Sequence, residues 1–144
     1  MIAVDTNLLV YAHRRDSEWH TPASRTLRHL AESTDAWAIP WPCIHEFLAV
    51  VTHPRIFDPP SGMEAALDQI GAWLESPSLT LLPEGPGYIE HLAGTLLTSR
   101  VSGAKTHDAR IAALCVYHGV RELWSADRDF SRFPGPVVRN PLVI

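Results

Sequence analysis

The apolar and polar positions of this chain follow two periods, which together predict strands separated by helices. Five short segments, each mainly apolar, are strand candidates: residues 2–4, 37–39, 79–82, 123–125 and 137–139. Between them, apolar positions recur every three or four residues, as in helices, at residues 8–13, 21–31, 42–52, 63–75, 87–100 and 108–118. Strands that alternate with helices predict right-handed crossovers and a mostly parallel sheet with helices on both faces.

The first predicted strand ends in three polar residues. Residues 2–4 are wholly apolar, as in a strand buried on both faces, and Asp5, Thr6 and Asn7 follow directly. In parallel sheets, ligands bind just beyond the carboxyl ends of the strands, so Asp5 stands where such proteins place their chemistry. Asp and Thr also cap helices and fill turns, so a purely structural role for Asp5 stays open at this point.

Other segments deliver acids to comparable places. Glu46 lies on a predicted helix that is almost entirely apolar, where a carboxylate needs a proton, a hydrogen bond or a cation unless it lies on an exposed flank. Asp108 starts the helix predicted for residues 108–118, where it also suits the helix dipole. Asp127 and Asp129 follow the strand at 123–125 as Asp5 follows the first strand, although a turn rich in Asp would show the same pattern.

Carboxylates that converge without cationic partners repel one another, and proteins tolerate this mainly around a metal ion. A set of oxygen ligands selects Mg²⁺ or Mn²⁺ over zinc. Such an ion can deprotonate a water and stabilise charge during attack on a phosphodiester. No Ser/His/Asp or Cys/His spacing stands out, which agrees with chemistry that needs no protein nucleophile.

Length and composition predict one globular domain over residues 1–144. The chain is 46% hydrophobic and 19% charged, and no apolar stretch approaches the roughly 20 residues that span a bilayer. An acid at position 5 argues against a signal peptide. Cys43 and Cys115 lie far apart in apolar helical patterns, so we expect small core residues in a reducing, cytoplasmic setting.

The net charge of −4 does not exclude a nucleic-acid ligand. If Asp5, Glu46, Asp108, Asp127 and Asp129 share one pocket, they carry five negative charges and leave the rest of the chain at +1. A divalent ion in that pocket would reverse the local sign.

Four segments carry a resemblance to a known family. They are IAVDTNLLVYA, PCIHEFLAVVTHP, HDARIAALCVYHGV and ELWSADRDFSRFPG, in this order from one end of the chain to the other. The chain resembles the PIN-domain ribonucleases, and most closely the VapC toxins of bacterial VapBC toxin–antitoxin pairs. The resemblance implies a three-layer α/β/α fold with a parallel five-stranded sheet in the order 3-2-1-4-5. It also implies cleavage of RNA that depends on Mg²⁺ or Mn²⁺, a cognate antitoxin and a toxin homodimer.

The motifs also assign residues. Carried over from the family, the catalytic and metal-binding acids are Asp5, Glu46, Asp108 and Asp127. Their hydroxyl neighbours are Thr6 and Ser125, while the role of Asp129 is less uniform in the family. Every acidic position of the pattern is present, so we expect an active enzyme.

Substrate contacts are less well determined by the sequence. Lys105, which we predict to lie in a loop over residues 101–106, is the most plausible single contact to an RNA phosphate. Trp41 and three other tryptophans could stack on bases, or could pack in the core or in a dimer. Two other functions stay open: a PIN-domain nuclease of RNA maturation without an antitoxin, and a non-catalytic module that binds RNA or a partner. The intact acids favour an enzyme, and the chain length favours the toxin.

Overall fold

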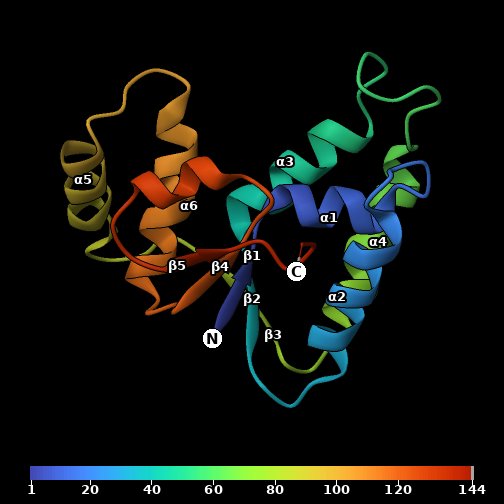
Figure 1. Cartoon of the computed structure of the whole chain (residues 1–144), viewed down its shortest axis with the longest axis horizontal. Coiled ribbons are helices and arrows are strands. Elements are labelled where there is room, and N and C mark those ends of the chain that lie inside the picture. The colour runs from blue at the N-terminus through green and yellow to red at the C-terminus, as the bar shows by residue number, and fades with distance from the viewer. Residues whose placement is uncertain (144) are drawn as a thin grey trace.

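The computed structural model describes residues 1–143, and its five strands form one parallel sheet (Figure 1). The strands are β1 (Ile2–Val4), β2 (Trp37–Pro40), β3 (Leu79–Leu82), β4 (Glu122–Trp124) and β5 (Val137–Arg139). Their order is β3-β2-β1-β4-β5, and every neighbouring pair is parallel. The predicted sheet order is therefore confirmed.

Helices cover both faces of this sheet. They are α1 (Thr6–His13), α2 (His20–Glu32), α3 (Trp41–Val51), α4 (Met63–Leu74), α5 (Tyr88–Ser99), α6 (Lys105–Tyr117) and the 3-10 helix η1 (Arg128–Arg132). The crossovers through α1–α4 run from β1 towards β3, whereas those through α5, α6 and η1 run the opposite way, so right-handed connections place the two sets on opposite faces. Figure 1 shows α5 and α6 across the sheet from α1, α2 and α4. The three-layer α/β/α architecture is as expected.

The sixth α-helix begins earlier than the sequence pattern predicts. It starts at Lys105, whereas we expected a loop over 101–106 and a helix start at Asp108, so both expectations were wrong by one turn. Gly103, at φ +62°, lies in the turn before this helix. Its carbonyl accepts two hydrogen bonds from Thr106, one from the amide at 3.1 Å and one from the hydroxyl at 2.8 Å. The apolar period begins only at Ala109, so the polar first turn of α6 carries no periodic signal.

The core lies between the sheet and the helices that pack on it. The predicted role of Cys43 and Cys115 as core residues is confirmed, since both are free and buried. Trp41, by contrast, is 41% exposed. No helix among residues 1–143 is long and apolar enough to cross a membrane. The largest fully buried side chains include Trp37, Phe47, Leu8, Leu9, Ile39, Leu82, Ile111, Leu114 and Leu123.

The order of strand addition reverses between β1 and β4, although all strands run parallel. From β1, one set of crossovers leads to β2 and β3 on one side, and the other set leads back to β4 and β5 on the other side. Parallel sheets open a crevice at such a switch point, beyond the carboxyl ends of the strands. Asp5 follows β1 and Ser125 follows β4, and the Asp5 amide donates to the Trp124 carbonyl at 3.0 Å, so the two strand ends are held side by side.

Candidate active site

Asp5 is buried at the end of β1, with only 4% of its surface exposed. Its Oδ1 accepts from the Thr6 amide at 2.8 Å and from the Cys43 thiol at 3.8 Å. Its Oδ2 accepts from the Ser125 hydroxyl at 2.7 Å and from the Asn7 amide nitrogen at 3.3 Å. Asp5 therefore caps α1, the role that the sequence left open, and the same contacts fix its carboxylate in one orientation.

Burial changes the acidity of Asp5. Desolvation raises its pKa from 3.8 to about 6, although hydrogen bonds from Ser125 and Thr6 lower it; the nearby Glu46 and Asp108 raise it further. At neutral pH the group is therefore mostly an anion. None of the ion pairs among residues 1–143 involves Asp5, so its charge is held by neutral donors alone.

Three further acids line the cavity into which Asp5 opens. The cavity has a volume of about 380 Å³, and Glu46 of α3, Asp108 of α6 and Asp127 after β4 all contribute to its wall. Glu46 is half-buried, and its Oε2 accepts from the Thr6 hydroxyl at 2.8 Å. The four acids that the family motifs assign thus come from four separate segments and border one space at the carboxyl ends of β1 and β4.

Asp127 and Asp129 differ in their surroundings. The Asp127 amide donates to the Ser125 hydroxyl at 3.0 Å, and its Oδ1 caps η1 by accepting from the Asp129 amide at 2.9 Å. Asp127 lines the cavity, whereas Asp129 does not, and the Asp129 side chain is 61% exposed. The two aspartates are therefore not equivalent.

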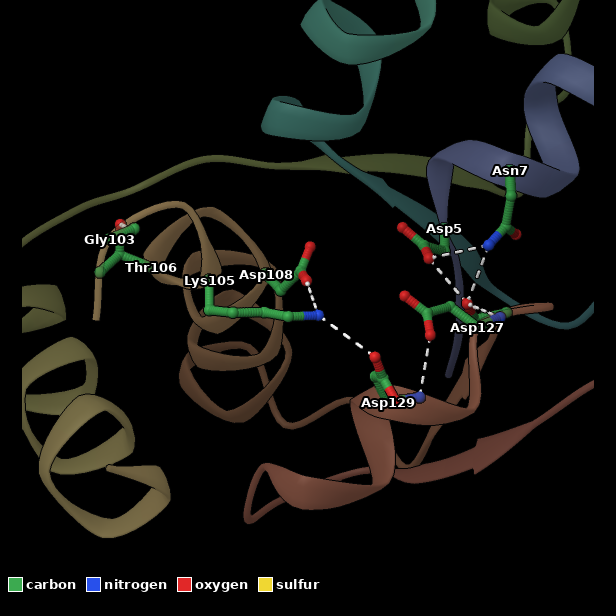
Figure 2. Close-up of polar contacts among 9 residues, drawn as sticks. Asp5, Asn7, Gly103, Lys105, Thr106, Asp108, Asp127 and Asp129 are labelled. Atoms are coloured by element: carbon green, nitrogen blue, oxygen red, sulfur yellow. Dashed lines mark hydrogen bonds and ion pairs between the residues drawn. The ribbon is translucent and has the colours of Figure 1, made fainter. Parts of the chain in front are cut away.

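Lys105 bridges two of these acids at the rim, as Figure 2 shows. Its Nζ lies 3.2 Å from Asp129 Oδ2 and 3.5 Å from Asp108 Oδ2. The hydrogen bond to Asp129 is the main reason that the pKa of Lys105 is raised. The sequence-based premise that the acids have no cationic partner was therefore wrong for Asp108. Both ion pairs are solvent-exposed and contribute little to stability.

Asn7 is the polar residue whose part in this arrangement the sequence analysis missed. Its Nδ2 donates to Asp5 and to the Ser125 hydroxyl at 3.2 Å, and its Oδ1 accepts from the Ala126 amide at 3.2 Å. Asn7 thus ties the end of β1 to the turn after β4. The available signal was its position two residues after Asp5, on the first turn of the same helix.

The rest of the cavity wall is apolar, which the acidic motifs did not indicate. Part of it comes from the segment after α3. The Arg14 guanidinium lies 4.2 Å above the centre of the Phe57 ring and holds this loop against the end of α1. The apolar lining residues are Val10, Tyr11, Val50, Ile56, Phe57 and Phe130.

The donors suit a hard divalent cation by their chemistry. All four acids offer oxygen, and the ionised, desolvated carboxylate of Asp5 gains most from a positive charge. As the side chains stand, no group of three or more His, Cys, Asp or Glu residues within 1–143 is arranged to hold a metal ion. Mg²⁺ does not require such a group, because it keeps several waters and is commonly bound through one or two carboxylates. The residues therefore fit Mg²⁺ or Mn²⁺ as an ion that remains partly hydrated.

The pKa of Asp5 makes the stability of the metal-free protein depend on pH. The folded chain keeps a proton on Asp5 up to about pH 6, whereas the unfolded chain releases it near pH 3.8. The resulting stabilisation is fully present below pH 3.8 and is lost as the pH rises through about 6. Asp5→Asn has no such proton. In EDTA, the free energy of unfolding of Asp5→Asn should therefore rise relative to that of the wild type, by up to about 3 kcal/mol, as the pH increases from 3.8 to about 6. Urea unfolding across a pH series measures the difference; a difference that does not vary with pH would contradict the burial effect.

A family model and several curated relatives match this chain. The model of the PIN domain matches residues 2–136. Ribonuclease VapC43 of Mycobacterium tuberculosis is 35% identical over 144 residues, which cover 99% of this chain and 96% of the relative. Ribonuclease VapC48 of the same organism is 29% identical over 137 residues, which cover 95% of this chain and 94% of the relative.

Solved structures with the same fold extend these matches. The structure of VapBC2 from Rickettsia felis, bound to a DNA fragment from the promoter, has a TM-score of 0.70 at 18% identity and covers 97% of this chain and 98% of the other. VapC20 of Mycobacterium tuberculosis has a TM-score of 0.69 at 17% identity and covers 91% of this chain and 93% of the other. At these identities the likeness shows a common fold.

Proposed function

The chain belongs to the PIN domain family and, within it, to the VapC ribonucleases, and from that premise we propose that it is an endoribonuclease toxin that depends on Mg²⁺ or Mn²⁺. Its reaction is hydrolysis of RNA phosphodiester bonds by water. The observation that carries this proposal is the meeting of Asp5, Glu46, Asp108 and Asp127 around one cavity at the switch point of the sheet. Relatives that match nearly the whole chain are named as ribonucleases, which supports the same reaction.

The divalent ion would supply a Lewis acid that lowers the pKa of a water and offsets charge on the phosphate. The chain supplies the rest. Asp5 presents an oriented carboxylate because the Thr6 amide and the Ser125 hydroxyl hold its two oxygens. Thr6 holds Glu46 through its hydroxyl, so one residue sets the positions of two acids. Asp108 and Asp127 complete the negative wall that would hold the cation.

We further assign this protein a cognate antitoxin and a homodimeric, cytoplasmic form. Support for the antitoxin comes from the structures that share the fold, which include VapBC and FitAB complexes. A free ribonuclease endangers its own cell, which gives the pairing its physiological reason. The acidic cavity suits an antitoxin arginine, because a guanidinium can grip a carboxylate with two parallel hydrogen bonds. A short reading frame beside the gene that encodes a DNA-binding protein would separate the toxin from a PIN-domain nuclease of RNA maturation.

One protein with the same fold supports RNA as the substrate: VapC20 is a toxin that cleaves the sarcin–ricin loop. We expect the purified protein to cleave single-stranded RNA with Mg²⁺ or Mn²⁺ and to stop when EDTA is added. Cleavage should return when Mg²⁺ is supplied in excess over the chelator, which excludes damage to the protein by EDTA. Undiminished cleavage in EDTA would contradict the metal-dependent reaction, and an absence of RNA binding and cleavage would contradict the proposed function as a whole.

A further inference from the structure

A second cavity opens at the same edge of the sheet, over β2 and β3. It has a volume of about 250 Å³. Trp41 is the first residue after β2 and Pro83 the first after β3, and these strands end in register, with Pro40 opposite Leu82. The mouth of this cavity is therefore level with the carboxyl ends of the strands, as the acidic cavity is. Its lining residues are Trp41, Pro42, His45, Pro83, Glu84 and Arg110.

The two cavities are neighbours because the same two helices contribute to both. From α3, Glu46 lines the acidic cavity and the adjacent His45 lines the second one. From α6, Asp108 lines the acidic cavity and Arg110 the second one. The separation is thus on the order of a helix diameter, about 10–12 Å. That distance corresponds to about three stacked nucleotides at roughly 3.4 Å each.

Arg110 has unused hydrogen-bonding capacity in this cavity. Its Nε is buried without a hydrogen-bond partner among residues 1–143, and none of the ion pairs in that range includes it. A buried donor left unpaired is costly, and a guanidinium offers five donors and no acceptor. Arg110 lines the cavity, so the terminal nitrogens of the same guanidinium can donate to a ligand that presents acceptors there.

Two other lining residues complete the chemistry. The Trp41 side chain is 41% exposed, and its ring lies 6.0 Å from that of His45 at an interplanar angle of 34°, which forms an accessible aromatic surface. Glu84 directly follows Pro83 in the connection between β3 and α5; it is exposed and offers a carboxylate, which only accepts hydrogen bonds when ionised. The cavity therefore combines an aromatic platform, a donor group and an acceptor group.

We propose that this cavity binds a guanine base of the RNA substrate, stacked on Trp41, close to the bond that is cleaved. Unpaired RNA bases are recognised by stacking on aromatic rings and by hydrogen bonds to their edges. Guanine offers the acceptors O6 and N7 to Arg110, and the donors N1–H and N2–H₂ to Glu84. Adenine would place its N6 amino donor against the guanidinium, and the pyrimidines lack N7 and present a smaller stacking face. The biological meaning of this site rests on the proposed ribonuclease activity, whereas base binding itself does not require cleavage.

Binding is tested in EDTA, where cleavage is not required. GMP, AMP, CMP and UMP are titrated into the full-length protein while the indole N–H resonances of its tryptophans are followed by NMR. We expect GMP to shift the Trp41 resonance, which is identified by its loss in Trp41→Phe, and to bind about fivefold or more tightly than the other three nucleotides. Equal responses to GMP and AMP, or no shift of the Trp41 resonance by GMP, would overturn the proposal.

Modified bases assign the two edges. We expect 7-deaza-GMP, which lacks N7, to bind more weakly than GMP to the wild type but equally to Arg110→Met, which has no donor. IMP lacks the 2-amino group, and its weaker binding should likewise disappear in Glu84→Ala, which has no acceptor. Arg121→Met is the matched control, because Arg121 is exposed and precedes β4 at the opposite edge of the sheet. Melting temperatures confirm that each variant folds. A preference for GMP that survives in Arg110→Met and Glu84→Ala would overturn the assignment.

Cleavage assays separate this proposal from the ribonuclease activity. With Mg²⁺ and an oligonucleotide that contains one guanine, we expect Trp41→Ala to raise KM by about fivefold to a hundredfold, with a smaller effect on kcat. Cleavage that does not depend on guanine or on Trp41 would overturn the guanine site and leave the ribonuclease intact. Selective GMP binding in a protein that cleaves no RNA would support the site and contradict the proposed function. A change of oligomeric state in Trp41→Ala without any loss of GMP binding would assign this surface to a protein contact instead.

Discussion

Replacing Asp5 by Asn is expected to lower the rate of RNA cleavage by about a hundredfold or more while the protein remains folded. The substitution keeps the size of the side chain and leaves one oxygen to accept from the Thr6 amide. It removes the only acid of the cavity that is both deeply buried and held at both carboxylate oxygens. A divalent ion lowers the free energy of the transition state by several kcal/mol, and in this variant it would lose its best-placed ligand. Losing part of that stabilisation corresponds to a rate loss of about a hundredfold or more.

Single-turnover cleavage at saturating Mg²⁺ measures this loss without a contribution from product release. The matched control is Asp35→Asn, because Asp35 is exposed and lies outside the cavity, so cleavage by that variant should equal that of the wild type. Far-ultraviolet circular dichroism checks the fold of both proteins. Cleavage by Asp5→Asn within a few-fold of wild type would show that Asp5 serves only as the cap of α1.

β1 and β2 were predictable because burial on both faces leaves an unbroken apolar run in the sequence, whereas the edge strands β3 and β5 are partly exposed and were predictable only from short, mainly apolar segments. The bounds of β1, β3 and β5 agree with the predicted runs at 2–4, 79–82 and 137–139. The start of α6 was not predictable in the same way, because its first turn is polar and lies at the rim of the cavity, where no apolar periodicity is needed. The same polarity concealed the ion pair of Lys105, which depends on a turn of helix that was read as a loop.

Convergence of the acids could be anticipated only because parallel strands end at one edge of the sheet. The positions of Asp5 and Asp127 after two neighbouring strands indicated one crevice. Contacts between distant segments leave no comparable trace. The hydrogen bond from Asn7 to Ser125 spans 118 positions, and the apolar wall supplied by Ile56 and Phe57 depends on how the loop after α3 folds back. Such features follow from tertiary packing and not from local periodicity.

The two aspartates after β4 should differ strongly in their effect on catalysis. Asp127→Asn is expected to slow cleavage by about tenfold to a hundredfold, whereas Asp129→Asn should slow it by no more than a few-fold. Asp127 lines the cavity, while Asp129 lies outside it with an exposed side chain. Asn is itself a good helix cap, so Asp127→Asn retains an acceptor for the Asp129 amide and isolates the loss of negative charge.

Lys105 provides the internal control for this comparison. Asp129→Asn removes one of the two carboxylates that hold its ammonium group and leaves the contact with Asp108. If Asp129 acts only by positioning Lys105, then Lys105→Met should affect single-turnover cleavage to the same extent as Asp129→Asn, and the double variant should be no slower than either single one. If Lys105 instead contacts an RNA phosphate, Lys105→Met should raise KM more than Asp129→Asn does and should reduce the dependence of binding on salt. A greater loss of cleavage in Asp129→Asn than in Asp127→Asn would contradict both outcomes, because it would mean that the exposed aspartate, and not the one in the cavity wall, faces the reacting phosphate.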